Sequence, residues 1–177
     1  MHLELLSDVS TEPLSTADAK AHLRIGGSDE DDLIDSYITA ARGALQEDTG
    51  RAFGEQQYKL TMRDFQTPIR LPKPPLVTVD SVKYYAPDAS SQSTFTDYRI
   101  AGQELEPEDN WPNVDDRADA VQITFTCGTP VPDRAILAMQ ELVGLYEHYR
   151  LPVVEGRPRQ VPDTYSRLAR GMKEFRW

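Results

Sequence analysis

The sequence predicts an α+β fold: a helical bundle of about three helices with an inserted antiparallel β-sheet or hairpin and a C-terminal amphipathic helical arm. Helical patterns occupy residues 15–48 and 132–175, toward the two ends of the chain. Alternating strand patterns, interrupted by prolines, occupy residues 58–128 between them. Strands that cluster in one stretch, instead of alternating with helices, are typical of this class.

The first helix is predicted from its end signals. Ser15 is a good N-cap, and Asp18 follows three positions later, in the acidic position of a capping box. We expect the helix to run to about Arg24, because Gly26 and Gly27 then form a stop signal.

The second helix has the clearest pattern and is expected from Ser28 to about Asp48. Ser28 can cap it, and residues 29–32 are all acidic in the first turn, where the helix dipole favours negative charge. Consecutive residues on a helix point in different directions, so these carboxylates are not expected to share a metal ion. Gly50 stands at the C-terminal stop. The apolar face comprises Leu33, Ile34, Tyr37, Ile38, Ala41 and Leu45.

Period-two alternation predicts the strands of the middle segment. Residues 58–63 alternate between apolar and polar and predict a half-buried strand. Residues 69–71 lie between prolines and form at most a short edge strand. Residues 76–85 are β-branched and aromatic, and their alternation slips near Asp80 and Ser81, which predicts a bulge.

Two further strands follow. Residues 86–93 are polar and turn-rich and predict a hairpin loop, with a returning strand over 94–100. The most regular strand is expected over 120–128. Its apolar face comprises Val121, Ile123, Phe125 and Cys127.

An acidic segment, residues 102–119, lies between these last two strands and carries seven carboxylates. It lacks the alternating ligands, central glycine and terminal Glu of a calcium-binding loop. We therefore expect a solvated or interface loop. Trp111 within it either projects as an interface anchor or folds back to hold the loop on the core, and the sequence leaves both interpretations open.

A third helix is predicted from about Pro132, which suits a first helical position, to Tyr149. Its apolar face comprises Ala135, Ile136, Met139, Leu142, Val143 and Tyr146.

The last helix, expected over residues 163–175, has a narrow apolar stripe and a basic face. One interpretation makes it a fourth core helix of the same domain. The proline-rich linker before it favours instead a docking arm, residues 157–177, that leaves a body formed by residues 1–156 and enters a partner's groove.

The charge distribution also suggests docking rather than chemistry. The net charge of −10 argues against a protein whose main task is to grip nucleic acid. Residues 157–177 nevertheless carry six basic and two acidic side chains, a net charge of +4, which leaves −14 on the rest of the chain. The sequence shows no membrane-length apolar run and no secretory signal, so we expect a protein of the reducing cytoplasm.

The sequence lacks catalytic and metal-binding motifs, and we expect no enzyme activity, cofactor or metal. No nucleophile elbow, P-loop, dinucleotide-binding motif or H-E-x-x-H is present. His2, in a terminus expected to fray, His22 and His148 stand in no motif. Cys127, the single cysteine, is expected to be a small buried side chain.

Several segments stand in a characteristic order: PLSTADAKAHLRI, SDEDDLIDSYITAARGALQEDTGRAF, LPKPPLVTVDSVKYY, YRI, a WP loop, DAVQITFTCGT, VPDRAILAMQELVGLYEHYR and a tail that ends in FRW. This ordered set covers nearly the whole chain. It resembles the head-tail connector (adaptor) family of long-tailed double-stranded DNA phages.

The resemblance implies a structural protein of the virion neck, assembled in the host cytoplasm. It would form a ring, usually dodecameric, below the portal, extend the DNA channel and link the head to the tail. The implied partners are the portal protein, identical subunits and the next neck or tail protein, while DNA passes without specific binding. The portal-docking arm would comprise Tyr165, Arg167, Leu168, Arg170, Met172, Lys173, Phe175, Arg176 and Trp177. A subunit or tail interface would involve Tyr84, Tyr85, Phe95 and Trp111.

Two other functions remain open. The chain could be a different neck component, either a stopper or a tail-completion protein, because sequence separates these classes poorly. A remote alternative is a small metal-dependent hydrolase that uses the seven carboxylates of residues 102–119.

Overall fold

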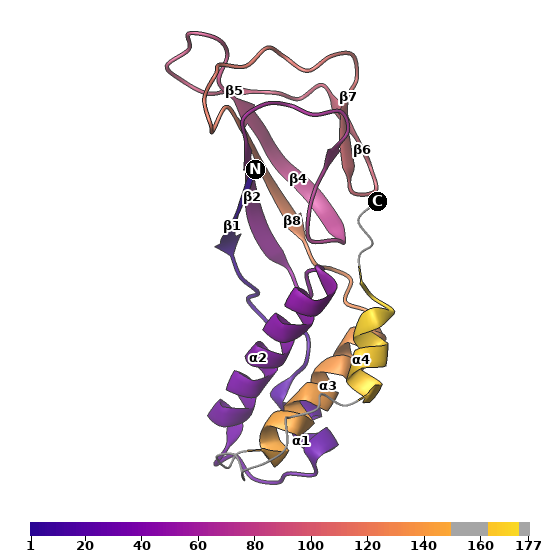
Figure 1. Cartoon of the computed structure of the whole chain (residues 1–177). Coiled ribbons are helices and arrows are strands. Elements are labelled where there is room, and N and C mark those ends of the chain that lie inside the picture. The colour runs from indigo at the N-terminus through magenta and orange to yellow at the C-terminus, as the bar shows by residue number, and fades with distance from the viewer. Residues whose placement is uncertain (150–162, 174–177) are drawn as a thin grey trace, which may run out of the picture. The chain divides into compact units, whose positions relative to one another are not determined.

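The computed structural model describes residues 1–149 and 163–173, which divide into two compact units (Figure 1). The β-rich unit comprises Met1–Ser10 and Gly54–Thr129, and the helical unit comprises Thr11–Phe53 and Pro130–Trp177. The predicted α+β class, with antiparallel strands inserted between helices, is confirmed. The expected boundary between a body and an arm, at residue 156, lies outside the described residues.

Four helices form the described part of the helical unit: α1 (Thr16–Leu23), α2 (Asp31–Thr49), α3 (Asp133–His148) and α4 (Asp163–Arg170). The predicted cap of α1 is confirmed, because the Ser15 hydroxyl accepts the Asp18 N–H at 3.1 Å. The same hydroxyl donates to the Asp18 carboxylate at 2.6 Å. Both interactions satisfy groups that would otherwise be unpaired at the helix start.

The second helix starts later than predicted. Ser28 is not its cap; its carbonyl accepts the Asp31 N–H at 3.3 Å in a turn that precedes α2. Asp31 also pairs with Lys20 of α1 at 2.5 Å. The predicted C-terminal stop is confirmed, because Gly50 has φ 75° and donates its N–H to the Gln46 carbonyl at 3.0 Å. Glycine adopts this left-handed conformation without a steric cost.

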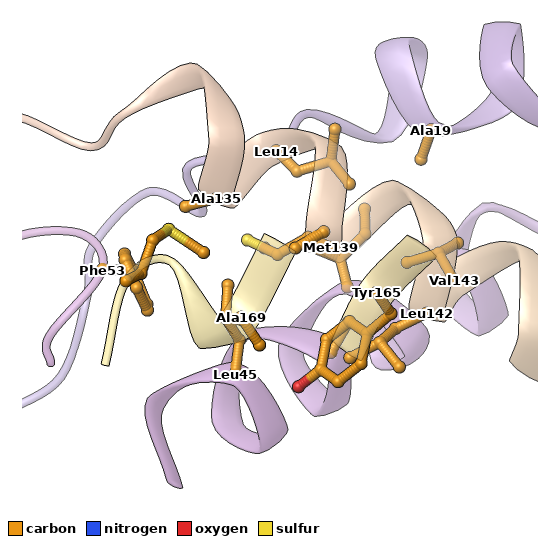
Figure 2. Close-up of a cluster of buried hydrophobic side chains, with 14 of the residues drawn as sticks. Leu14, Ala19, Leu45, Phe53, Ala135, Met139, Leu142, Val143, Tyr165 and Ala169 are labelled. Atoms are coloured by element: carbon orange, nitrogen blue, oxygen red, sulfur yellow. The ribbon is translucent and has the colours of Figure 1, made fainter. Parts of the chain in front are cut away.

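The apolar faces of α2 and α3 form the core of the helical unit, as predicted (Figure 2). Leu33 departs from the prediction, since it is 38% exposed. An ion pair supports the core from the segment before α1, where the buried Arg42 side chain donates to Glu12 at 2.8 Å. The buried set from α2 and α3 is Ile34, Ile38, Ala41, Leu45, Ala135, Ala138, Met139, Leu142 and Val143.

Two antiparallel sheets form the β-rich unit. The larger has the order β1-β2-β8-β4-β5, with β1 (His2–Ser7), β2 (Gln56–Met62), β8 (Val121–Cys127), β4 (Leu76–Tyr84) and β5 (Ser93–Thr94). The smaller has the order β3-β7-β6, with β3 (Ile69–Arg70), β7 (Glu104–Pro107) and β6 (Tyr98–Ala101).

The alternation predicted for the central strands is confirmed. Alternate residues of β2 and β8 are buried along the full length of both strands. Tyr58 and Phe125 are register partners, and their ring centroids lie 6.0 Å apart. The predicted bulge is also confirmed, since the pairing of β4 shifts register between Val79 and Ser81.

Two strand predictions are wrong. The N-terminus is not frayed: residues 2–7 form β1, which pairs with β2. The acidic segment is not wholly a loop either, because β7 lies within it and pairs with β6 through a tight turn at Gly102, φ 63°. Leu105 of β7 is fully buried, although the residues before and after it in sequence are glutamates. The many acidic residues of this segment obscured the alternation of buried and exposed positions in the sequence. The strand expected over 94–100 is consequently divided between the two sheets, as β5 and β6.

Candidate interaction surfaces

Tyr165 of α4 lies inside the helical core, where it is 3% exposed. Figure 2 shows its ring among the core side chains, near Leu142. The Tyr165 hydroxyl donates to the Asp48 carboxylate of α2 at 2.6 Å. Burial and the adjacent Asp48 charge raise the pKa of Tyr165, so the hydroxyl remains a neutral donor.

The rest of α4 and the turn after it extend this contact. Ala169 is 3% exposed and Met172 is 8% exposed, and both belong to the helical core. The guanidinium of Arg134, on α3, lies over Gly171 so closely that a β-carbon at this position would collide with it. Position 171 therefore has no room for a larger side chain unless Arg134 moves.

The structure corrects the expected exposure of the apolar stripe. Tyr165, Leu168 and Met172 pack on their own subunit and are not free to enter a partner's groove. The physical reason is that the apolar face of α4 packs against α2 and α3. The only polar group of the stripe, the Tyr165 hydroxyl, donates a hydrogen bond to the Asp48 carboxylate. Of the expected arm, Phe175, Arg176 and Trp177 lie outside the described residues, as do the linker residues 150–162.

A basic surface remains on the exposed side of α4. It comprises Arg167, Arg170 and Lys173, together with Arg134 of α3, and all four side chains are exposed. Within residues 1–149 and 163–173, none of the four forms an ion pair with an acidic side chain. We call these four residues the basic surface.

An open pocket lies beside the basic surface. Its lining is Asp48, Tyr165, Ser166, Ala169, Arg170 and Lys173. Arg170 and Lys173 belong both to this lining and to the basic surface, and the Asp48 carboxylate in the lining accepts the Tyr165 hydroxyl. The pocket therefore belongs to the same surface chemically.

An aromatic cluster gathers three of the four residues predicted as a subunit or tail interface. Trp111 stacks on Phe65 with ring centroids 4.5 Å apart and an interplanar angle of 3°, and its Nε1–H donates to the Gln66 carbonyl at 2.9 Å. The ring centroids of Phe95 and Trp111 lie 5.3 Å apart, and those of Tyr84 and Phe65 lie 6.1 Å apart. Trp111 thus folds back and holds its segment, which is the second of the two interpretations left open.

Two residues modify this picture of the aromatic cluster. Tyr85, the fourth predicted residue, lies apart from it under the Arg117 guanidinium, which is 3.8 Å from the ring centroid. Phe65 occupies the centre of the cluster, but the sequence analysis missed it. Its only signal was a large apolar residue in a stretch of turn-forming residues. The rings are partly exposed, so their outer edges remain available to a partner.

Three of the seven carboxylates of residues 102–119 pair with arginines and do not form a shared centre. Glu106 pairs with Arg99 at 2.7 Å, and Asp119 pairs with Arg117 at 2.6 Å. Asp116 pairs with Arg63 at 2.5 Å. In the part of the chain that the structure describes, no group of three or more His, Cys, Asp or Glu side chains could hold a metal ion. None of the described helices is long and apolar enough to span a membrane.

Cys127 provides a simple test of the packing of β8. It is fully buried, and burial raises the pKa of its thiol to about 12. Because the thiolate is the reactive form, we expect no reaction with a thiol-specific reagent at pH 8 in the folded protein and complete reaction in 8 M urea, measured by absorbance. Rapid labelling of the folded chain would contradict this packing.

Residues 15–112 match the model of a family described as "Phage gp6-like head-tail connector protein". A search of curated proteins gives no match.

The fold is similar to chains of gene transfer agent (GTA) particles. One belongs to the "Neck of empty GTA particle computed with C6 symmetry", with TM-score 0.81 and 21% identity over 100% of this chain and 97% of that chain. A second, with TM-score 0.79 and 21% identity over the same shares, belongs to the "Virion of native gene transfer agent (GTA) particle". A third belongs to the "Neck of native GTA particle computed with C12 symmetry", with TM-score 0.79 and 19% identity, again over 100% and 97%.

Proposed function

Because the chain belongs to the phage gp6-like head-tail connector family, we propose that it is a structural neck protein that forms a ring below the portal of a phage-like particle. In this position it extends the DNA channel and links the head to the tail. The protein assembles in the host cytoplasm and acts by binding, without a catalytic step.

The family match over residues 15–112 is the observation that carries this proposal. The shared fold supports a cyclic arrangement, since two of the similar chains belong to necks that were computed with C6 and C12 symmetry. A ring of twelve subunits is compatible with both symmetries. A contact of modest strength is sufficient in a ring, because it recurs identically around the axis.

The charge of the chain is compatible with a DNA channel. A protein that binds DNA tightly neutralises phosphates with Lys and Arg and releases their counterions. This chain has 29 acidic and 19 basic side chains, a net charge of −10. A ring with this balance repels phosphates on average, so DNA can move through it without being held.

The basic surface is the proposed contact with the portal. Its four side chains are exposed and form no ion pair within the described residues, although the chain as a whole has a net charge of −10. They are Arg134, Arg167, Arg170 and Lys173. Exposed cations with no partner of their own are suited to a complementary acidic surface. The proposal thus moves the contact from the apolar stripe of α4 to its opposite face, while Phe175, Arg176 and Trp177 remain candidate contacts beyond the described residues.

The aromatic cluster is the proposed contact with a neighbouring subunit or the next neck or tail protein. Its partly exposed rings offer rigid apolar area of the kind that is enriched at protein interfaces. Tyr84 and Phe95 supply that area within the cluster, Tyr85 adds to it from outside the cluster, and Trp111 mainly holds the cluster together.

A binding experiment distinguishes this function from the other neck roles. Purified protein is mixed separately with DNA-filled tailless heads that lack it and with isolated tails, and each mixture is sedimented. We expect saturable co-sedimentation with the heads and none with the tails. Binding to tails alone would identify a tail-completion protein, and binding to heads only after another neck protein has been added would identify a stopper.

A further inference from the structure

Two outer strands of the β-rich unit, β1 and β6, have an open edge in the described part of the chain. β1 pairs with β2 on one side only, and β6 pairs with β7 on one side only. The outer strands β3 and β5 contain two residues each and offer little edge. The outer edge of β4 is also open before Lys83, because β5 pairs only with Lys83 and Tyr84, but the pairing of β4 shifts register twice along this stretch. An open edge presents unpaired N–H and C=O groups to any strand that can lie beside it.

Each open edge carries an aliphatic side chain that faces the core but is not covered. Leu5 of β1 lies opposite Tyr58, which is 6% exposed, and Ile100 of β6 lies opposite Leu105, which is fully buried. Directly opposed residues in a sheet share a face. Leu5 and Ile100 are nevertheless each 46% exposed, so the missing cover lies beyond the strand edge.

The hydrogen bonding of β6 shows which of its backbone groups face the open side. The Asp97 carbonyl accepts the Glu108 N–H at 2.9 Å, so alternate residues from 97 onward turn their backbone groups toward β7. Ile100 falls between these residues. Its N–H and C=O therefore point away from β7, toward the open side.

The lengths of the two edges agree. The pairing of β1 with β2 is regular from His2 to Leu5 and shifts register between Leu5 and Ser7. β6 spans the 4 residues Tyr98–Ala101. With Leu5 beside Ile100 in parallel, residues 3–5 can pair with residues 98–100, which is three residues of each strand before the irregularity in β1.

A cyclic ring needs two different complementary surfaces on each subunit, because one head-to-tail contact repeats around the axis. We propose that β1 of one subunit pairs with β6 of the next copy of this chain, in parallel, with Leu5 beside Ile100. This proposal rests on the ring of the proposed function and identifies the contact that closes it.

Charge complementarity favours the parallel orientation. With Leu5 beside Ile100, a parallel register sets Glu4 beside Arg99, whereas an antiparallel register sets it beside Ala101. Within one subunit Glu4 already pairs with Lys59 at 2.6 Å, and Arg99 pairs with Glu106 at 2.7 Å. Parallel pairing therefore produces one row of alternating sign across the joined sheets: Lys59, Glu4, Arg99 and Glu106.

Disulfide trapping tests the pairing. The test uses the full-length double variant Leu5→Cys/Ile100→Cys. If the strands pair as proposed, Cα of residue 5 in one subunit and Cα of residue 100 in the next lie within the range that a disulfide spans, about 4.4–6.8 Å. After addition of copper phenanthroline, we expect a ladder of multimers on a non-reducing gel. A mixture of the two single variants should give dimers only. The control Leu33→Cys/Leu137→Cys places cysteines at two other exposed aliphatic positions and should remain monomeric.

The outcomes separate the contact from the ring. Disulfide dimers of the Leu5→Cys single variant alone would indicate β1–β1 pairing and overturn the head-to-tail contact. Rings in negative-stain images, accompanied by monomers on the gel, would also overturn the edge pairing but leave the ring intact. Monomers on the gel, together with no rings in solution and none on heads, would overturn both proposals.

Discussion

The variant Tyr165→Ala is expected to lower the free energy of unfolding of the helical unit by about 3–5 kcal/mol, as for other buried aromatic truncations. The Tyr165 ring is 3% exposed and belongs to the core formed with α2 and α3. Its removal leaves a cavity and detaches α4 from its hydrogen bond to Asp48. Urea denaturation followed by circular dichroism measures the change.

Two further variants distinguish the contribution of the Tyr165 aromatic ring from that of its hydroxyl and from that of a neighbouring exposed residue. Tyr165→Phe removes only the hydroxyl and should cost about 1 kcal/mol, the usual net value of a hydrogen bond. Ser166→Ala lies on the exposed side of the same helix and should change stability by less than about 0.5 kcal/mol. An unchanged urea midpoint for Tyr165→Ala would show that α4 is not part of the core.

The same packing changes the expectation for a truncated chain. If residues 163–177 formed a free arm, their deletion would leave the body folded and remove only portal attachment. Because Tyr165, Ala169 and Met172 are buried in the helical unit, deletion should destabilise that unit as well. Truncation is therefore a poor test of docking, and surface substitutions are needed instead.

Charge reversal of the basic surface should have the largest effect on assembly. In the variant Arg167→Glu/Arg170→Glu/Lys173→Glu, attraction to an acidic partner becomes repulsion in every subunit of the ring. We expect the yield of tailed particles to fall more than about ten-fold, because a loss of about 1.4 kcal/mol at one contact already weakens its affinity ten-fold and the contact recurs in every subunit. Particles are counted by electron microscopy after the variant gene replaces the normal one.

A matched control tests whether position or only net charge matters. Arg24→Glu/Lys73→Glu/Lys83→Glu produces the same change of charge at three positions outside the basic surface that have no ion-pair partner in the described part of the chain. This variant should assemble at near-normal yield. Equal losses in the two variants would assign the effect to net charge and remove the basic surface from the portal contact.

Local signals predicted much of the fold because they act over a few residues. The Ser15 cap, the Gly50 stop and the alternation of β8 each depend on neighbouring positions, and each is confirmed. β7 was missed because acidic residues surround its buried Leu105, whereas β1 was missed because its partner is distant in sequence. β1 exists because β2 lies beside it, although the two strands are about 50 residues apart in sequence.

The surface against which the C-terminal helix packs could not be predicted for a similar reason. An apolar stripe at positions 165, 168 and 172 fits a partner's groove and a seam in its own subunit equally well. Two contacts of α4 and the turn after it, Tyr165 with Asp48 and the exposed Arg134 side chain over Gly171, join residues far apart in the chain. The sequence contains no local signal for either contact.

Cryo-electron microscopy of the assembled particle tests the central claim most directly. Focused reconstruction of the neck should place this chain in a cyclic ring directly below the portal, with the basic surface of α4 against the portal protein and the DNA path through the ring. A reconstruction with the chain only on the tail tube, or remote from the portal vertex, would contradict the proposed function.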